Sequence, residues 1–360
     1  MFKRYFPGFD WWIAGCALLL LAGSVFVMLT TGPGIDQRDA IWQSIYGAVG
    51  LVCFFLVARF DYRLIRRYTP ALYVVMVALL ILVHLTGTEI FGARRWIDLG
   101  VFQLQPSEVA KVIFVIILAK YFSGRSGRPS LKEMAHSLVY LLLPLALVVT
   151  QPDLGTALVF IAIWIVFLLA ARVRWVHLAA MGSACLLLAP VIWDALRPYQ
   201  QSRILTFLDP SRDPLGAGYN VTQAQIAVGS GGLWGRGVGH ATQSNLSFLP
   251  VQHIDFIFAA WAEELGLIGV AALLTVFAVL LTRTARAASS ARDRFGMYLA
   301  VGVSAMLLFH VLVNVGMNVG LMPVTGIPLP LISYGGTSVV MTMVALGLIE
   351  SIVMRSRSPR

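Results

Sequence analysis

Long apolar stretches, separated by short polar segments, run through the whole chain. A helix that crosses a bilayer needs about 20 consecutive apolar residues. Several of the stretches are shorter, so we expect those helices to be partly surrounded by protein. A Pro-Gly turn signal at 151–155 divides the two stretches that are hardest to separate. The pattern predicts ten membrane-spanning helices, at 11–30, 41–60, 70–86, 107–122, 136–150, 155–171, 175–195, 256–282, 297–320 and 332–354.

Composition supports the same architecture. Hydrophobic residues make up 58% of the chain and charged residues 12%, whereas soluble domains carry roughly 25% charged residues. The chain is therefore expected to be an all-α polytopic membrane protein with a single domain over 1–360. Its formal net charge of +10 does not call for a nucleic-acid partner, because basic cytoplasmic loops explain it in a membrane protein.

The distribution of Lys and Arg predicts the orientation of the chain. With both termini in the cytoplasm, every segment on that side carries at least two basic residues, as the positive-inside rule expects. The one long connection, 196–255, then lies outside, directly before the eighth helix. Apolar and aromatic residues throughout this loop favour packing against the membrane domain over disorder.

An acidic residue, Asp255, stands where the long loop enters an apolar stretch. A carboxylate at membrane depth is costly and generally faces a partner or a wet cavity, so Asp255 is a candidate functional residue. Glu263 and Glu264 follow in the same stretch. His253 precedes Asp255 by two residues and is either a base or a hydrogen-bonded structural residue.

Two further polar groups each allow a structural and a functional interpretation. Glu108 and Lys111 are three residues apart and share a helix face. They predict either an ion pair that neutralises two intramembrane charges or a charged cavity wall. Asp153 is either a helix N-cap or part of the cavity lining.

Basic residues on the external side form a third group. Arg94, Arg95 and Arg203 run against the orientation rule, so some interaction should hold them there. Arginine suits bidentate binding of phosphate, and Trp96 follows the Arg pair directly. The two interpretations are salt bridges to Asp98 or other acidic loop residues, and contact with an anionic head group.

The glycine-rich segment 229–239 lacks the Gly-Lys-Ser/Thr ending of a P-loop and is expected to form turns. No group of His, Cys and Asp has the spacing of a zinc site. An enzyme and a carrier are both compatible with intramembrane acids and broken helices. A carrier is disfavoured because no inverted repeat is apparent and the polar features cluster on the external side. A non-enzymatic scaffold is a third alternative.

Five segments carry specific motifs. They are Gln-Pro-Ser-Glu-x-x-Lys at 105–111, Gln-Pro-Asp-Leu-Gly-Thr-Ala at 151–157, His-x-Asp-Phe-Ile-Phe at 253–258, Glu-Glu-Leu-Gly at 263–266, and Pro-Val-Thr-Gly-x-Pro-Leu-Pro…Ser-Tyr-Gly-Gly-Thr-Ser at 323–338. Together they resemble the SEDS family of bacterial cell-wall proteins over nearly the whole chain. The short ends resemble the elongation branch, since the division branch usually has longer termini.

The resemblance implies a peptidoglycan glycosyltransferase of the bacterial inner membrane that polymerises lipid II during elongation and cell-shape maintenance. The transfer would invert the anomeric carbon and release a polyprenyl diphosphate, in a cavity facing the periplasm. Expected partners are lipid II, the lipid-linked nascent glycan, a class B penicillin-binding protein that supplies transpeptidation, and membrane lipids. A flippase of lipid-linked precursor and a division-type homologue are the alternatives.

The family's functional residues fall on residues already singled out. Its essential acid falls on Asp255. A lipid diphosphate leaving group needs cations, and the acceptor hydroxyl needs a base. Asp255 is therefore expected to deprotonate the 4-hydroxyl of the incoming sugar, or to hold a divalent cation, Mg²⁺ or Mn²⁺, that does the same. The residues expected to bind substrate are Arg203, Lys111, Glu108, Arg94, Arg95, Trp96, Asp153, Gln223, His253 and Ser333.

Overall fold

The computed structural model describes residues 8–31, 37–90, 93–100, 102–125, 127–213, 216–245 and 254–357. Within these ranges, each of the ten predicted spans is occupied by one long helix. The helices are α2 (Trp11–Thr30), α3 (Gln37–Arg59), α4 (Tyr62–Thr86), α5 (Pro106–Ser123), α6 (Leu131–Thr150), α7 (Leu154–Ala170), α8 (Trp175–Ala195), α12 (Ile257–Ser290), α13 (Arg294–Asn318) and α14 (Gly336–Arg357).

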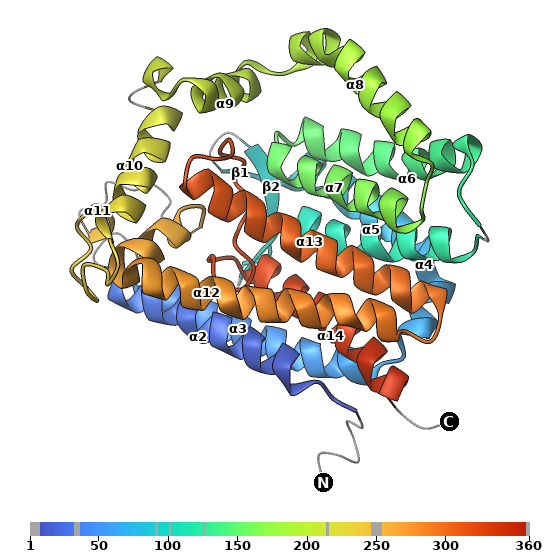
Figure 1. The fold of residues 1–360 in the computed structure, drawn as a ribbon, viewed down its shortest axis with the longest axis horizontal. Helices are drawn as coiled ribbons and strands as arrows, with labels where there is room; N and C mark the ends of the chain where they lie inside the picture. Colours follow the sequence, from blue (N-terminus) through green and yellow to red (C-terminus); the bar gives the residue numbers. More distant parts are fainter. Residues whose placement is uncertain are drawn as a thin grey trace.

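Seven of the described helices are long and apolar enough to cross a membrane, namely α2, α3, α4, α6, α12, α13 and α14. The shorter α7 and the first part of α8 are apolar as well. The helical class and the multi-pass membrane architecture predicted from the sequence are therefore confirmed. Figure 1 shows most of the long helices running side by side as an elongated bundle, with the start of α2 and the end of α14 at the same end of it.

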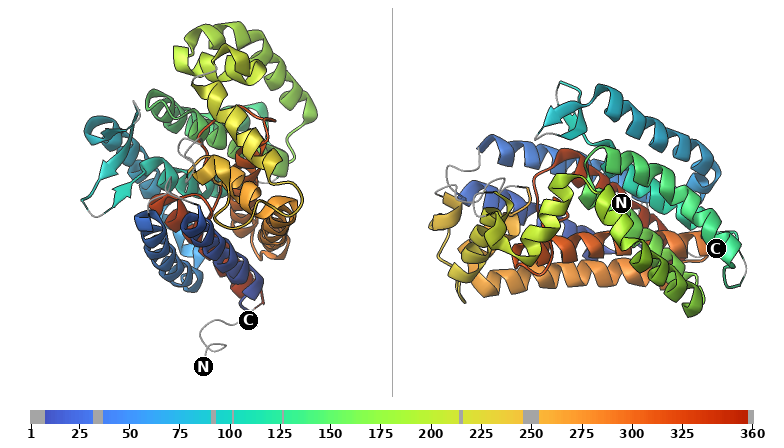
Figure 2. Two further views of the ribbon diagram at one scale, coloured as in Figure 1. Left: turned by 90° about the vertical axis from the view of Figure 1, so that its left-hand side faces the viewer. Right: turned by 90° about the horizontal axis from the view of Figure 1, so that it is seen from above.

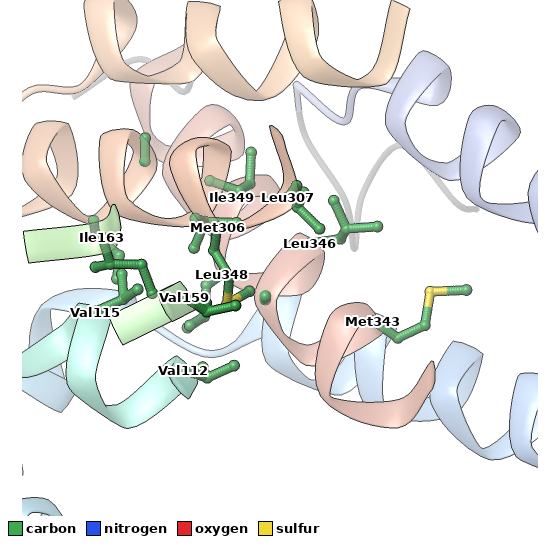
Figure 3. Packing of buried hydrophobic residues seen from close by; sticks show 14 of the residues in the cluster. Val112, Val115, Val159, Ile163, Met306, Leu307, Met343, Leu346, Leu348 and Ile349 are labelled. Atoms are coloured by element: carbon green, nitrogen blue, oxygen red, sulfur yellow. The ribbon is translucent and has the colours of Figure 1, made fainter. Parts of the chain in front are cut away.

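The centre of the bundle is a continuous apolar core between α5, α7, α13 and α14. Figure 3 shows buried side chains from these four helices; Met343 points away from the others, which include Val112, Val115, Val159, Ile163, Met306, Leu307, Leu346, Leu348 and Ile349. The short helices α5 and α7 are buried along most of their length, as expected for spans surrounded by protein. In contrast, α8 is exposed, with Leu186 at 77% and Leu187 at 80%.

A small antiparallel sheet lies between α4 and α5, which the all-α prediction did not include. Its strands are β1 (Thr88–Ile90), β2 (Ala93–Asp98) and β3 (Gln103–Leu104), in the order β1-β2-β3. Ile97 pairs with Leu104, and Asp98 pairs with Gln103. The sheet presents Arg95 and Trp96 toward the site described below.

The long connection 196–255 contains α9 (Pro198–Leu208), a 3-10 turn (Pro210–Arg212), α10 (Ala217–Ser230) and α11 (Thr242–Asn245). Helices α8, α9 and α10 form an arch along one side of the bundle (Figures 1 and 2). Ala224 and Ala227 of α10 pack against Phe256 and Ala259 at the start of α12. The expected packing of this loop is confirmed for α10, although Trp234 is 81% exposed.

Helix α12 is broken at Gly266, whose φ of 64° and ψ of −165° are not helical. The glycine-rich segment docks on the break with its backbone. The amide of Arg236 donates to the Glu263 carbonyl at 2.9 Å, and the amide of Leu267 donates to the Gly232 carbonyl at 2.9 Å. A Cβ on Gly235 would stand 2.0 Å from the Glu264 carbonyl oxygen, so only glycine permits this approach. The segment forms turns, as predicted.

The side chains of Glu263 and Glu264 hold the same loop and the end of α2. The Glu263 carboxylate accepts from the Gln243 amide at 2.8 Å, and Glu264 accepts from the Thr30 hydroxyl at 2.7 Å. Both residues are buried, and a buried carboxylate requires hydrogen bonds of this kind. These two acids therefore attach the long connection to the bundle.

Candidate active site

A cavity of about 710 Å³ lies where the sheet, α3, α5, α9, the start of α12, the 319–335 loop and the start of α14 meet. Six of the residues predicted from the sequence to act in the site line it: Arg95, Trp96, Glu108, Lys111, Arg203 and Asp255. They come from four separate parts of the chain. The fold thus brings into one cavity most of the charged residues that the sequence analysis singled out.

The backbone on either side of Asp255 is fixed by three side chains. Asn314 and Asn318 on α13 donate to the Asp255 carbonyl at 3.2 Å and 3.1 Å. The Ser333 hydroxyl donates to the Ile254 carbonyl at 2.6 Å. These donors hold the residue just before α12, with its half-buried carboxylate facing the cavity. Ser333 acts through the backbone and is not among the described lining residues.

Two guanidinium groups share the cavity with the Asp255 carboxylate and act on it through their charge. Burial raises the pKa of Asp255 to about 6, while the charges of Arg203 and Arg95 oppose the rise. The Arg203 guanidinium donates to the Val324 carbonyl at 3.2 Å, which ties α9 to the 319–335 loop. Burial lowers the pKa of Arg203, and the nearby charge of Arg95 lowers it further. The cavity wall therefore holds a carboxylate beside two cationic groups.

Arg95 also connects the sheet to the turn between α6 and α7. It donates to the Gln151 carbonyl at 3.3 Å and to the Pro152 carbonyl, and its guanidinium lies 3.9 Å from the Asp153 carboxylate. Asp153 in turn caps α7, accepting from the Thr156 amide at 3.1 Å and from the Thr156 hydroxyl at 2.9 Å. The N-cap interpretation of Asp153 is confirmed, and Arg95 has the acidic loop partner that one of the two interpretations expected.

Lys111 lies at the inner end of the cavity and has two partners. Its ammonium group is 2.7 Å from Glu108 Oε1 and 3.0 Å from His310 Nε2. His310 Nδ1 lies 3.2 Å from the Pro328 carbonyl. Since the carbonyl can only accept, Nδ1 carries the proton and Nε2 accepts from Lys111. Glu108 and Lys111 are thus both an ion pair and part of the cavity wall, which satisfies both interpretations of these residues.

Other predicted site residues lie elsewhere. Arg94 is exposed on β2 and Gln223 is on α10, and neither is among the described residues that line the cavity. His253 lies outside the described residues.

The sequence analysis also missed contributors. His310, Asn314 and Asn318 are polar residues inside an apolar span, a signal that could have identified them. The aromatic lining from Trp42, Tyr46 and Tyr334 had no such signal.

Comparisons with known proteins agree on one family. The family model of cell cycle proteins that groups FtsW, RodA and SpoVE matches residues 11–358. The chain is 40% identical over 341 residues to the peptidoglycan glycosyltransferase MrdB of Escherichia coli K12, covering 93% of this chain and 91% of MrdB.

Solved structures give the same answer. One is from work on the structural coordination of polymerization and crosslinking by a peptidoglycan synthase complex. Its TM-score is 0.85, with 35% identity, 97% of this chain covered and 98% of that chain. Another is the rod shape determining protein RodA of Thermus thermophilus, with a TM-score of 0.73, 31% identity and 99% of each chain covered.

The asparagine anchor of Asp255 predicts a local loss of order when it is removed. Asn314→Leu takes away one of the two side-chain donors to the Asp255 carbonyl and the donor to the Ile327 carbonyl, and an unpaired buried carbonyl costs about 1–3 kcal/mol. We expect a lower melting temperature in detergent and faster amide exchange in a peptide covering 254–260. The matched control is Leu312→Ala, at a 52% exposed position of the same helix. Equal exchange in both variants would contradict the anchoring role.

Proposed function

The chain belongs to the SEDS family of FtsW, RodA and SpoVE and is a peptidoglycan glycosyltransferase, and we propose that Asp255 is the base its reaction requires. Similarity to rod-shape-determining relatives supports a role in cell elongation. The substrates we propose are lipid II and the lipid-linked nascent glycan. The observation that carries the proposal is the Asp255 carboxylate, which lines the cavity beside Arg203 and Arg95.

The proposed reaction is a single displacement at an anomeric carbon. The 4-hydroxyl oxygen of the acceptor sugar forms the new bond, the bond from that carbon to the diphosphate breaks, and the hydroxyl proton passes to Asp255. The configuration inverts because only one displacement occurs. The departing diphosphate keeps the electron pair, and its charge is stabilised by the cationic groups of Arg203, Arg95 and Lys111.

We propose that the cavity opens on the periplasmic side of the inner membrane. The described helices would form ten spans, with both termini in the cytoplasm and 196–255 outside. The position of the ends supports this arrangement, because Arg357 donates to the Asp10 carboxylate at 3.2 Å. The segments before α5, before α7, before α12 and before α14 all contribute to the site, which supports their lying on one side.

A class B penicillin-binding protein is the proposed partner. The similar structure from a peptidoglycan synthase complex couples polymerization with crosslinking, and this chain would supply only the polymerization. A transpeptidase acting on the new strand would complete the wall. The flippase alternative has no support from the names of relatives such as MrdB and RodA, which are peptidoglycan glycosyltransferases.

A divalent cation is a further proposal at the same site. The described residues contain no group of three or more His, Cys, Asp and Glu that could hold a metal. The site instead suits an ion that is bound in the way typical of Mg²⁺, by one or two carboxylates together with substrate phosphates. Asp255 would be that carboxylate, and the ion would neutralise charge on the diphosphate.

The role of Asp255 predicts loss of activity without loss of structure. Asp255→Asn keeps the shape of the side chain but cannot accept a proton, and general-base catalysis is worth about 10²–10⁴-fold. We expect glycan polymerisation by the purified protein with its partner to fall at least about hundredfold. The control is Asp209→Asn, a surface carboxylate of the same connection that pairs with Arg212. Near-normal polymerisation by Asp255→Asn would remove it from the mechanism.

The raised pKa of Asp255 predicts an acid limit to activity. A base works only when ionised, so the rate should rise with pH through about 6 and fall toward tenfold per pH unit below it. Because the charge of Arg203 lowers this pKa, Arg203→Gln should move the midpoint to higher pH. Initial rates across pH 5–8 in both proteins check this prediction. A midpoint that does not move would assign the acid limit to another group.

The cation proposal has its own test. Excess EDTA should lower the initial polymerisation rate, and added Mg²⁺ or Mn²⁺ should restore it, because the ion would share the charge of the diphosphate with the arginines. A calcium–EDTA control separates chelation from ionic strength. An unchanged rate after exhaustive chelation would exclude the cation and leave the proposed base intact.

A further inference from the structure

Three aromatic side chains stand side by side along one wall of the cavity, and the proposed reaction uses none of them. Trp42 and Tyr46 on α3 are stacked, with ring centroids 5.8 Å apart and an interplanar angle of 26°. Tyr334 follows, with its ring centroid 6.3 Å from that of Tyr46. All three rings are half-buried and line the cavity that Asp255 lines. We call Trp42, Tyr46 and Tyr334 the aromatic wall.

The aromatic wall is held in place by buried polar contacts. Gln43, between its first two members in sequence, donates to the Ser333 carbonyl at 3.1 Å and accepts from the Gly335 amide at 3.4 Å. These bonds join α3 to the segment that carries Tyr334. A Cβ on Gly336 would stand 2.8 Å from the Tyr46 ring, so the absence of a side chain at Gly336 makes room for this ring. The rings are therefore positioned before any ligand arrives, which reduces the entropic cost of binding.

The surroundings of the wall identify the ligand class. Gln103, Gln105 and Ser338 line the same cavity, so amides and a hydroxyl are available beside the rings. A pyranose ring has an apolar face of C–H groups that covers an aromatic ring and a rim of hydroxyls that bond to such polar groups. An isoprenoid tail could pack against the rings but could not form hydrogen bonds with the polar side chains. The mixture of flat rings and polar side chains matches a carbohydrate.

We propose that Trp42, Tyr46 and Tyr334 form a subsite that binds pyranose rings of the growing glycan strand next to Asp255. This inference rests on the proposed function and adds a binding site to it. A strand that stays bound to the aromatic wall after one transfer remains in the cavity for the next transfer. The wall would therefore set the length of the product more than the rate of the first coupling.

Direct binding tests the subsite without catalysis. In an Asp255→Asn background, the protein is titrated with chitotetraose, a soluble β-1,4-linked N-acetylglucosamine tetramer, and binding is followed on the ligand by NMR. We expect Trp42→Ala to weaken binding about tenfold, as the loss of one stacked ring implies, and Tyr46→Phe to keep most of it. The control is Trp175→Ala, at a 77% exposed position on α8. Equal affinity with and without Trp42, or Trp42-dependent binding of geranylgeranyl phosphate in place of the sugar, would overturn the subsite.

Product length tests the same idea with the active protein. With Trp175→Ala on exposed α8 as the control, which should give strands of wild-type length, Trp42→Ala should shorten the glycan strands several-fold. Wild-type strand lengths in this variant would contradict the subsite. The two proposals fail separately: polymerisation by Asp255→Asn would exclude the base, whereas the chitotetraose titration reports on the wall alone.

Discussion

Asp255 holds a carboxylate at the edge of an apolar bundle, where an unpaired ion would cost several kcal/mol. Burial moves its pKa up to about 6, and the charges of Arg203 and Arg95 limit the rise. The two arginines in turn repel each other, and the acidic groups of Asp255 and Asp153 offset that repulsion. The charges of Arg203 and Asp255 therefore depend on neighbours from distant segments of the chain.

Hydrogen bonds that involve backbone carbonyls also hold these charged residues in place. Arg203 donates to the Val324 carbonyl, and Arg95 donates to the Gln151 carbonyl. The chain at Asp255 is held by the amides of Asn314 and Asn318. The two guanidinium groups and the backbone of Asp255 thus have partners that cannot titrate. Catalytic electrostatics are strong when the charged groups are oriented before the substrate arrives, and this arrangement meets that condition.

Hydropathy predicted the ten long helices because it depends on each segment alone. The same reasoning selected Asp255, Lys111 and Glu108, since a charge in an apolar stretch is conspicuous by itself. What it missed depends on partners far away in the chain. The lysine contact of His310 spans 199 residues, and the break at Gly266 depends on the docking of the glycine-rich segment 229–239. The strands β1–β3 are short and are defined by their pairing. Trp42 and Tyr46 had no signal because aromatic residues in an apolar helix normally face lipid or core.

The three acids at the beginning of α12, Asp255, Glu263 and Glu264, fall into two kinds, and their contacts tell them apart. Glu263 and Glu264 resemble Asp255 in sequence context, yet their carboxylates accept hydrogen bonds from the chain and attach a loop. At Asp255 the chain's donors reach the carbonyl group, and the carboxylate is left facing the cavity and two arginines. The carboxylates of Glu263 and Glu264 are directed at donors of the fold. The carboxylate of Asp255 is positioned through its backbone and is directed at the cavity. This distinction, which hydropathy does not contain, separates the proposed base from its neighbours.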